Sequence, residues 1–203
     1  MSARLIYAFD PLCGWCYGFA PALRALRAAL PNLQIDLVMG GLVTGGRIGP
    51  YSEAADYIRA ASARLEAVTG VALSEAFKAK ILNDPSITSS SIPPCDALLQ
   101  VRHAAPERVL DVAEAIQIAH FRDGSDLNDP ATYAGIMRRL SIKLDVTLPA
   151  PTQISPALAQ EFAATRALGL TSYPSLLMAS GGDPRSVDLT YDPDALVARI
   201  RVV

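Results

Sequence analysis

Hydrophobic positions follow two different patterns along this chain. Short continuous apolar runs, which are typical of buried strands, occur near both ends. They predict strands at Leu5–Phe9, Leu33–Met39, Ser175–Ala179 and Ser186–Leu189. The last two runs flank a Gly-rich turn and therefore predict a β-hairpin. A closing helix is predicted from Pro193 to about Arg201, with Asp192 as its N-cap.

Between the first two strands, apolar residues recur at helical spacing. Phe19, Leu23 and Leu26 lie on one face of a helix that continues to about Leu30. Pro21 is expected to kink this helix, because proline cannot donate the hydrogen bond to residue i−4. Strand, helix and strand in direct succession predict a βαβ unit with parallel strands and a right-handed crossover.

The middle of the chain has the helical pattern almost throughout. From Pro50 to about Leu168, amphipathic stripes alternate with breaks that contain proline or glycine, and we predict roughly five or six helices there. The preceding Gly-rich segment, Gly40–Arg47, lacks the Gly-Lys-Ser/Thr end of a phosphate-binding loop. It is expected to be a flexible exit loop, and its Gly-rich backbone near the redox pair is a candidate wall of the substrate cleft.

The amino-acid composition and charge of the chain exclude some classes of protein. With 203 residues, 51% of them hydrophobic, the chain can bury a substantial core. A net charge of -2 without a basic run argues against nucleic acid as a partner, since phosphates require clustered Lys and Arg. No apolar run approaches the length of a membrane span. Met1 leads directly into a strand without signal-peptide regions, and three cysteines suit a reducing compartment, so we expect a cytoplasmic protein.

Two cysteines separated by two residues lie where the first strand meets the first helix. This spacing and position predict a redox pair. Cys13 is near the helix N-terminus, where unpaired backbone N–H groups and the helix dipole favour a thiolate. Cys16, one turn further along, is within reach of a mixed disulfide formed at Cys13. We therefore assign Cys13 as the attacking thiol and Cys16 as the resolving thiol.

The remaining thiol and imidazoles do not complete a metal site. A structural zinc site needs a second closely spaced ligand pair, and Cys95, His103 and His120 do not form one, so we predict no bound metal. Cys95 is expected to be a small buried apolar residue, with a third redox-active thiol at the cleft edge as the alternative. His120 is expected in the core, and His103 has no catalytic partner in the sequence. The serines of Ser89–Ser91 are expected to form a loop and helix cap.

The order of these elements resembles a known family. The chain has, in order, a strand, the Cys13-Gly14-Trp15-Cys16 motif, a helix, a second strand, a helical insertion and a Tyr173-Pro174 pair that opens a β-hairpin. This arrangement resembles the DsbA-like disulfide oxidoreductases. Within them it resembles the cytosolic FrnE-like branch of predicted protein-disulfide isomerases. The resemblance implies an α/β thioredoxin fold with a large inserted helical domain. It implies a discontinuous thioredoxin-like domain at 1–42 and 169–203, with the inserted domain at 43–168.

The resemblance also implies roles for single residues. Pro174 matches a cis-proline that faces the active-site cysteines, and Tyr173 matches the residue whose backbone pairs with an extended substrate. Gly14 and Trp15 complete the expected substrate-binding set. They replace the Pro-His dipeptide of DsbA, which removes an imidazolium and implies a less oxidising protein. Asp10 is the nearest candidate for the family's buried proton acceptor, and a helix-capping role for its side chain is the alternative.

The function implied is a thiol-disulfide oxidoreductase or isomerase acting on protein or peptide thiols. We expect it to need no cofactor, with glutathione as a candidate co-substrate. Two alternatives stay open. One is a glutathione-dependent isomerase or transferase of the kappa-like architecture, in which Cys13 occupies the position of a serine and Cys16 is unnecessary. The other is a redox-gated binding module whose cysteine pair senses oxidants.

Overall fold

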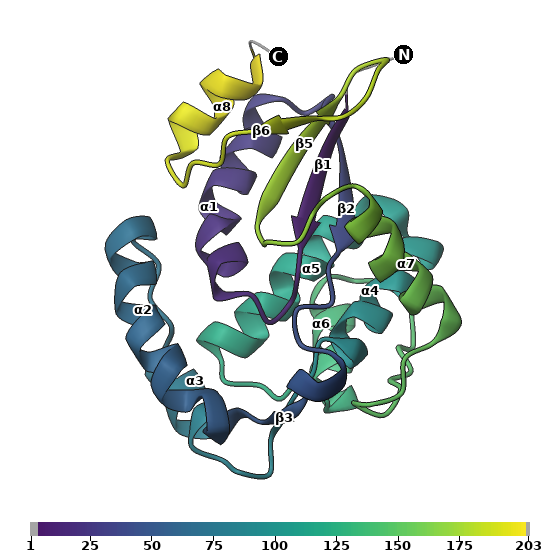
Figure 1. Ribbon diagram of the computed structural model, residues 1–203. Coiled ribbons are helices and arrows are strands. Elements are labelled where there is room, and N and C mark those ends of the chain that lie inside the picture. Colours follow the sequence, from purple (N-terminus) through teal and green to yellow (C-terminus); the bar gives the residue numbers. More distant parts are fainter. Residues whose placement is uncertain (1–3, 202–203) are drawn as a thin grey trace.

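The computed structural model describes residues 4–201, and its centre is a mixed β-sheet (Figure 1). Within the described residues the sheet has the strand order β2-β1-β5-β6. β1 pairs in parallel with β2, as the predicted βαβ unit requires, and antiparallel with β5. The predicted strands are confirmed with small shifts of their ends: β1 (Arg4–Phe9), β2 (Gln34–Met39), β5 (Ser175–Ala179) and β6 (Arg185–Val187).

β1 is buried on both faces, because its alternate side chains enter different clusters. Leu5, Tyr7 and Phe9 belong to the main core, which also contains buried residues of α1 (Gly14–Ala29) and α8 (Pro193–Arg201). Ile6 and Ala8 point to the other face and pack with a separate small cluster. This two-sided burial places the end of β1, and the cysteine motif that follows it, inside the molecule.

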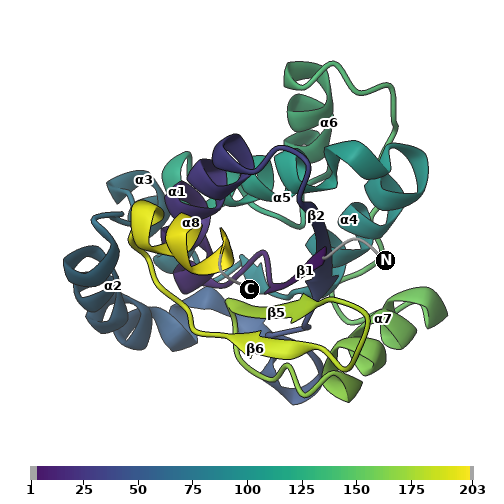
Figure 2. The same cartoon turned by 90° about the horizontal axis from the view of Figure 1, so that it is seen from above.

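Helices α1 and α8 lie against each other beside the sheet, as Figure 2 shows from above. α1 is a single helix that contains Pro21, and the expected kink there stays a prediction. α8 begins at Pro193, and the Asp192 carboxylate accepts a hydrogen bond from the N–H of Ala195 at 2.8 Å. The predicted N-cap of the closing helix is therefore confirmed.

The segment between β2 and β5 is largely helical. Among the described residues it holds six α-helices, which agrees with the five or six predicted, and α3 and α5 each continue into a π-helical turn. A short strand pair, β3 (Gly49–Pro50) with β4 (Thr88–Ser89), was not predicted. The helices are α2 (Ala55–Thr69), α3 (Glu75–Phe77), α4 (Ile92–Ala104), α5 (Val109–Gln117), α6 (Pro130–Arg139) and α7 (Pro156–Ala167).

The sheet and the helical segment share one core. Phe9 and Phe19 belong to the same buried cluster as Leu98 of α4 and Ile116 of α5. α7 packs against β2, where the Glu161 carboxylate accepts the N–H of Met39 at 3.1 Å. The division into domains at 1–42, 43–168 and 169–203 therefore stays a prediction. No helix within residues 4–201 is long and apolar enough to cross a membrane.

Candidate active site

The cysteine motif lies at the junction between the end of β1 and the start of α1. Cys13 is the N-cap of α1, and its Sγ accepts a hydrogen bond from the backbone N–H of Cys16 at 3.2 Å. This geometry directs the N-terminal end of the helix, with its positive partial charge, at the Cys13 sulfur. Both cysteines are free thiols; Cys13 is 5% exposed and Cys16 is completely buried. The sequence-based placement of the pair is confirmed.

The hairpin brings Tyr173 to the same sulfur. The Tyr173–Pro174 peptide bond is cis, as the family resemblance implied. The Cys13 thiol donates a hydrogen bond to the Tyr173 carbonyl at 3.2 Å, although 160 residues separate the two in the chain. The Tyr173 ring lies against Gly40 at the end of β2, where a Cβ atom would be only 1.8 Å from the ring. A side chain at position 40 would therefore require the Tyr173 ring to move.

A cavity of about 400 Å³ opens beside Cys13. Of the residues expected to bind substrate, Gly14, Trp15 and Tyr173 line it, whereas Pro174 does not. Leu42 also lines it, whereas no other residue of Gly40–Arg47 does, so the role of this segment as a wall of the substrate cleft stays a prediction. None of the described residues that line this cavity is Asp, Glu, Lys, Arg or His. The cavity therefore suits apolar and aromatic groups.

Helix α2 supplies a wall of this cavity that the sequence analysis did not assign. Tyr57, Ile58, Ala61 and Leu65 line it. The amphipathic pattern of this helix was visible in the sequence, since apolar residues recur at positions 58, 61 and 65. A hydrophobic stripe does not reveal whether it faces a packed core or an open cavity, because both need the same apolar surface.

Asp10 is completely buried, and its carboxylate forms hydrogen bonds with three segments of the chain. Its carboxylate accepts hydrogen bonds from the N–H of Leu12 at 3.0 Å, the N–H of Leu42 at 2.7 Å and the hydroxyl of Ser91 at 2.9 Å. Burial raises the pKa of Asp10 to about 6, although these donors act in the opposite direction. Cys13, not Asp10, caps α1, so the alternative helix-capping role for Asp10 was wrong.

Ser91 has a role beyond the predicted loop and cap. It precedes α4 as the cap residue, but its hydroxyl makes no capping hydrogen bond to that helix. The hydroxyl donates to Asp10 and accepts the N–H of Val43 at 2.9 Å. Ser91 therefore connects the start of α4 to the Gly-rich segment and to the carboxylate below the cysteine motif.

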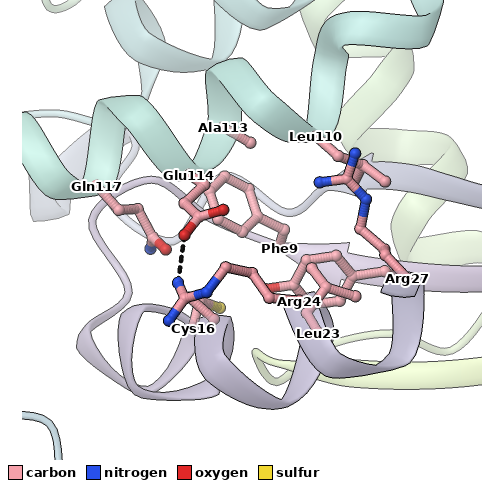
Figure 3. Close-up of a pocket in the computed structure, with 11 residues that line it drawn as sticks. Phe9, Cys16, Leu23, Arg24, Arg27, Leu110, Ala113, Glu114 and Gln117 are labelled. Carbon is pink, nitrogen blue, oxygen red and sulfur yellow. Dashed lines mark hydrogen bonds and ion pairs between the residues drawn. The ribbon is translucent and has the colours of Figure 1, made fainter. Parts of the chain in front are cut away.

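The environment of Cys16 favours the protonated thiol. Burial raises the pKa of Cys16 well above its usual range, and the neighbouring Cys13 and the Asp10 charge raise it further. Cys16 lines a second, much smaller cavity between α1 and α5, which shares no lining residue with the first (Figure 3). The two thiols thus face two different cavities.

Gln117, at the end of α5, was not identified from the sequence. Its amide Nε2 donates to the carbonyls of Cys13 at 3.2 Å, Asp10 at 3.4 Å and Pro11 at 3.5 Å. The side chain is 2% exposed and therefore has few alternatives to these partners. A glutamine on a helix carries no sequence signal for this role, because its partners lie more than a hundred residues away.

The third thiol, Cys95, and the imidazole of His120 are both buried in the core. Cys95 lies in α4, is completely buried and does not line the cavity at Cys13, so its prediction as a buried apolar residue is confirmed. His120 is also completely buried, between the Tyr51 hydroxyl at 2.9 Å and the Ser125 carbonyl at 3.0 Å. Burial lowers the pKa of His120 to about 4. Among residues 4–201, no cluster of His, Cys, Asp and Glu could hold a metal ion.

No protein-family model and no curated protein sequence matches this chain. Solved structures are similar to it over nearly its whole length. The cytosolic disulfide reductase DsbM from Pseudomonas aeruginosa has a TM-score of 0.82 and 23% identity, covering 98% of this chain and 97% of that chain. The same reductase with GSH has a TM-score of 0.81 and 23% identity, with 98% of each chain covered.

Two further structures extend the comparison. A probable DsbA oxidoreductase from Streptomyces coelicolor has a TM-score of 0.66 and 17% identity, covering 99% of this chain and 89% of that chain. A 2-hydroxychromene-2-carboxylate isomerase has a TM-score of 0.61 and 14% identity, covering 98% and 94%. These similarities define the fold: the chain has the DsbA-like thioredoxin fold, with a helical insertion between β2 and β5, as its sequence predicted.

Proposed function

We propose that this protein is a thiol-disulfide oxidoreductase or isomerase that acts on protein or peptide thiols through Cys13 and Cys16. The position of the Cys13 sulfur carries the proposal, because it lies at the N-terminus of α1 and beside an apolar cavity. An incoming disulfide can reach this sulfur, whereas Cys16 is buried behind it. The similarity to a cytosolic disulfide reductase supports both the activity and a cytoplasmic location.

The reaction begins at Cys13. Its thiolate attacks one sulfur of a substrate disulfide, forms a mixed disulfide with it and releases the other sulfur as a thiolate. The N–H of Cys16 and the positive end of α1 stabilise negative charge on Cys13 Sγ before the attack. Cys16 then loses its proton and attacks Cys13 Sγ. This forms the Cys13–Cys16 disulfide and releases the second substrate sulfur as a thiolate.

The dithiol form must be regenerated for another turnover. Two molecules of a small thiol can reduce the Cys13–Cys16 disulfide and leave as the oxidised dimer, which balances the two electrons. We propose glutathione for this role, supported by the structural similarity to DsbM solved with GSH. The protein's own chemistry then needs no bound cofactor.

The substrate-binding surface combines backbone and apolar contacts. We propose that an extended peptide pairs with the backbone of Tyr173 next to Pro174, while its side chains enter the cavity beside Gly14 and Trp15. Burying an unpaired charge in this cavity is unfavourable, so apolar or aromatic neighbours of the substrate cysteine fit better than acidic ones. Asp10 remains our proposed proton acceptor within the protein, because it is a buried carboxylate whose pKa is raised to about 6.

A second candidate is a glutathione-dependent isomerase or transferase. The similarity to a 2-hydroxychromene-2-carboxylate isomerase favours it, since the chain covers 94% of that structure. In such an enzyme Cys13 would interact with glutathione and Cys16 would be unnecessary. A redox-gated binding module is the third possibility that the test must separate.

Trapping experiments distinguish these functions. Cys16→Ser is expected to accumulate mixed disulfides at Cys13 with a peptide disulfide and to stop turnover, because the resolving thiol is missing. Cys13→Ser should form none. Cys95→Ala is the matched control and should behave like the unmodified protein, since Cys95 is buried away from the cavity.

Each other outcome points to a different function. Continued turnover of a glutathione substrate by Cys16→Ser would favour the isomerase or transferase. A Cys16→Ser protein that forms no mixed disulfide with any peptide disulfide, while still binding partners, would refute the proposed oxidoreductase and favour the binding module.

A further inference from the structure

Helix α2 forms one side of the cavity beside Cys13 and contacts α1 near its start (Figure 1). Leu65 marks this contact, because its Cδ2 atom is 3.7 Å from the position that a Cβ atom would have at Gly14. One turn of an α-helix rises about 5.4 Å. Residues one turn before Leu65 on the same face of α2 are therefore within reach of a side chain next to a substrate cysteine bound at Cys13.

Ser62 lies one turn before Leu65 and lines the same cavity. It is 9% exposed, and among residues 4–201 no other group donates a hydrogen bond to its hydroxyl or accepts one from it. A serine inside a helix usually points to solvent or bonds back to the carbonyl of residue i−4. Ser62 does neither, so its buried hydroxyl remains available to a group inside the cavity.

The other buried polar groups of this cavity already have partners. Among the described residues that line it, those with a buried thiol or hydroxyl are Cys13, Tyr51 and Ser62. The Tyr51 hydroxyl pairs with a buried histidine at 2.9 Å, and the Cys13 thiol donates to the Tyr173 carbonyl at 3.2 Å. The Ser62 hydroxyl is therefore the buried group that a ligand can still pair with.

Tyr57 offers an aromatic surface to the same cavity. It lines the cavity and is nevertheless 78% exposed. Of the exposed large hydrophobic residues between positions 4 and 201, none of the others lines this cavity. Packing a ligand ring against Tyr57 removes apolar surface of both from water and is favourable.

We propose that the cavity receives the side chain of a tyrosine or tryptophan next to the substrate cysteine, with Ser62 hydrogen-bonding its polar group and Tyr57 packing against its ring. At about 400 Å³ the cavity has room for an aromatic side chain. A serine hydroxyl both donates and accepts, so it can pair with a phenol O–H or an indole N–H.

Phenylalanine fits this cavity less well than tyrosine. Its ring fills the same space and excludes water from Ser62, but it leaves the buried hydroxyl without a partner, which is unfavourable. The expected order of preference is therefore tyrosine and tryptophan, then phenylalanine, then alanine. This inference rests on the proposed function and deepens it, since it names the class of peptide that Cys13 attacks fastest.

The experiment measures attack by Cys13 on short, otherwise neutral peptides in a stopped-flow instrument. Each peptide contains one cysteine joined by a disulfide bond to nitrothiobenzoate, with tyrosine, tryptophan, phenylalanine or alanine before or after that cysteine. The Cys13 thiolate attacks the peptide sulfur, forms the Cys13–peptide disulfide and releases the nitrothiobenzoate thiolate, which absorbs visible light.

A symmetric aryl disulfide, dithiobis-nitrobenzoate, is the reference because it carries no peptide. The first phase of its thiol release reports attack by Cys13, and the second phase reports attack by Cys16. Its first phase therefore measures the reactivity of Cys13 without any contribution from a peptide side chain.

Ser62→Ala is the decisive variant. In the unmodified protein the tyrosine and tryptophan peptides should react about three- to ten-fold faster than the phenylalanine peptide, which corresponds to one neutral hydrogen bond. Ser62→Ala should abolish this preference by slowing the tyrosine and tryptophan peptides without slowing the phenylalanine peptide. A merely structural role of Ser62 would instead slow all peptides alike.

Two further variants on α2 test the aromatic contact. Tyr57→Ala should slow the three aromatic peptides by about three-fold or more and leave the alanine peptide and the aryl disulfide unchanged. Val68→Ala is the matched control and should behave like the unmodified protein, because Val68 is an exposed residue of the same helix that does not line the cavity. Thermal unfolding of each variant shows whether its fold is intact.

Clear results would overturn the proposal. Equal rates for the tyrosine and phenylalanine peptides in the unmodified protein would exclude the role of Ser62, whatever the stability of its variant. Rates of the aromatic peptides that are unchanged in Tyr57→Ala, or no faster than that of the alanine peptide, would exclude the aromatic contact. Failure of every peptide and of the aryl disulfide to form a mixed disulfide at Cys13 would instead refute the proposed oxidoreductase function, so the two failures are distinguishable.

Discussion

The buried Asp10 carboxyl should make the stability of the reduced protein depend on pH. Its folded-state pKa is raised from 3.8 to about 6, chiefly because burial disfavours the charged form. As the pH rises between these two values, the unfolded chain releases the proton while the folded protein retains it. Stability therefore falls as the pH rises through this window, and the loss is complete above about pH 6.

The size of this effect follows from the two pKa values. The interval from 3.8 to about 6, at 1.36 kcal/mol for each pH unit, corresponds to about 3 kcal/mol of unfolding free energy. Asp10→Asn removes the titration and should abolish this contribution. The asparagine also leaves a backbone N–H without its carboxylate acceptor, at a cost of about 1–3 kcal/mol, but that cost is independent of pH and cancels in the comparison.

Urea unfolding of the reduced protein measures the effect. The unfolding free energy should be determined at about pH 4 and about pH 7.5 for the unmodified protein and for Asp10→Asn. Over this interval the pH dependence of the two should differ by about 2 kcal/mol, because the unfolded carboxyl is already partly ionised at pH 4. Asp145→Asn, at an exposed carboxylate, is the matched control and should retain the pH dependence of the unmodified protein. Identical pH dependence in Asp10→Asn and the unmodified protein would refute the raised pKa and remove the basis for Asp10 as a proton acceptor.

Two further substitutions test how the active-site loop is held. Gly40→Ala should destabilise the protein by about 1–3 kcal/mol in urea unfolding and slow the reaction of Cys13, because the new Cβ would overlap the Tyr173 ring; unchanged stability and rate would show that the ring moves aside freely. Gln117→Leu should cost about 1–3 kcal/mol, because the carbonyls of the cysteine loop lose a buried donor. Its effect on the first phase of the aryl disulfide reaction would show whether Gln117 also positions Cys13, and no change in either measurement would contradict a role for this contact.

The sequence by itself determined the local elements and the redox pair. β1 could be predicted because a strand buried on both faces is a continuous apolar run, and Asp192 because a side-chain cap acts within one helical turn. The placement of Cys13 and Cys16 at a strand-to-helix junction is equally local, since only two residues separate them. The cis Tyr173–Pro174 bond came from the family resemblance, because the local sequence does not distinguish it from a trans bond.

Only the tertiary structure decided what surrounds these thiols. Asp10 was a candidate from its position near Cys13, but its hydrogen bond to Ser91 joins residues 81 positions apart in the chain. Gln117, the α2 wall of the substrate cavity and the small cavity at Cys16 likewise arise where distant segments pack together. Hydrophobic periodicity shows which face of an element is buried, but it does not show which other element covers that face. Contacts of this kind depend on how the whole chain closes and packs, so the chemistry around the cysteine pair becomes visible only in the folded protein.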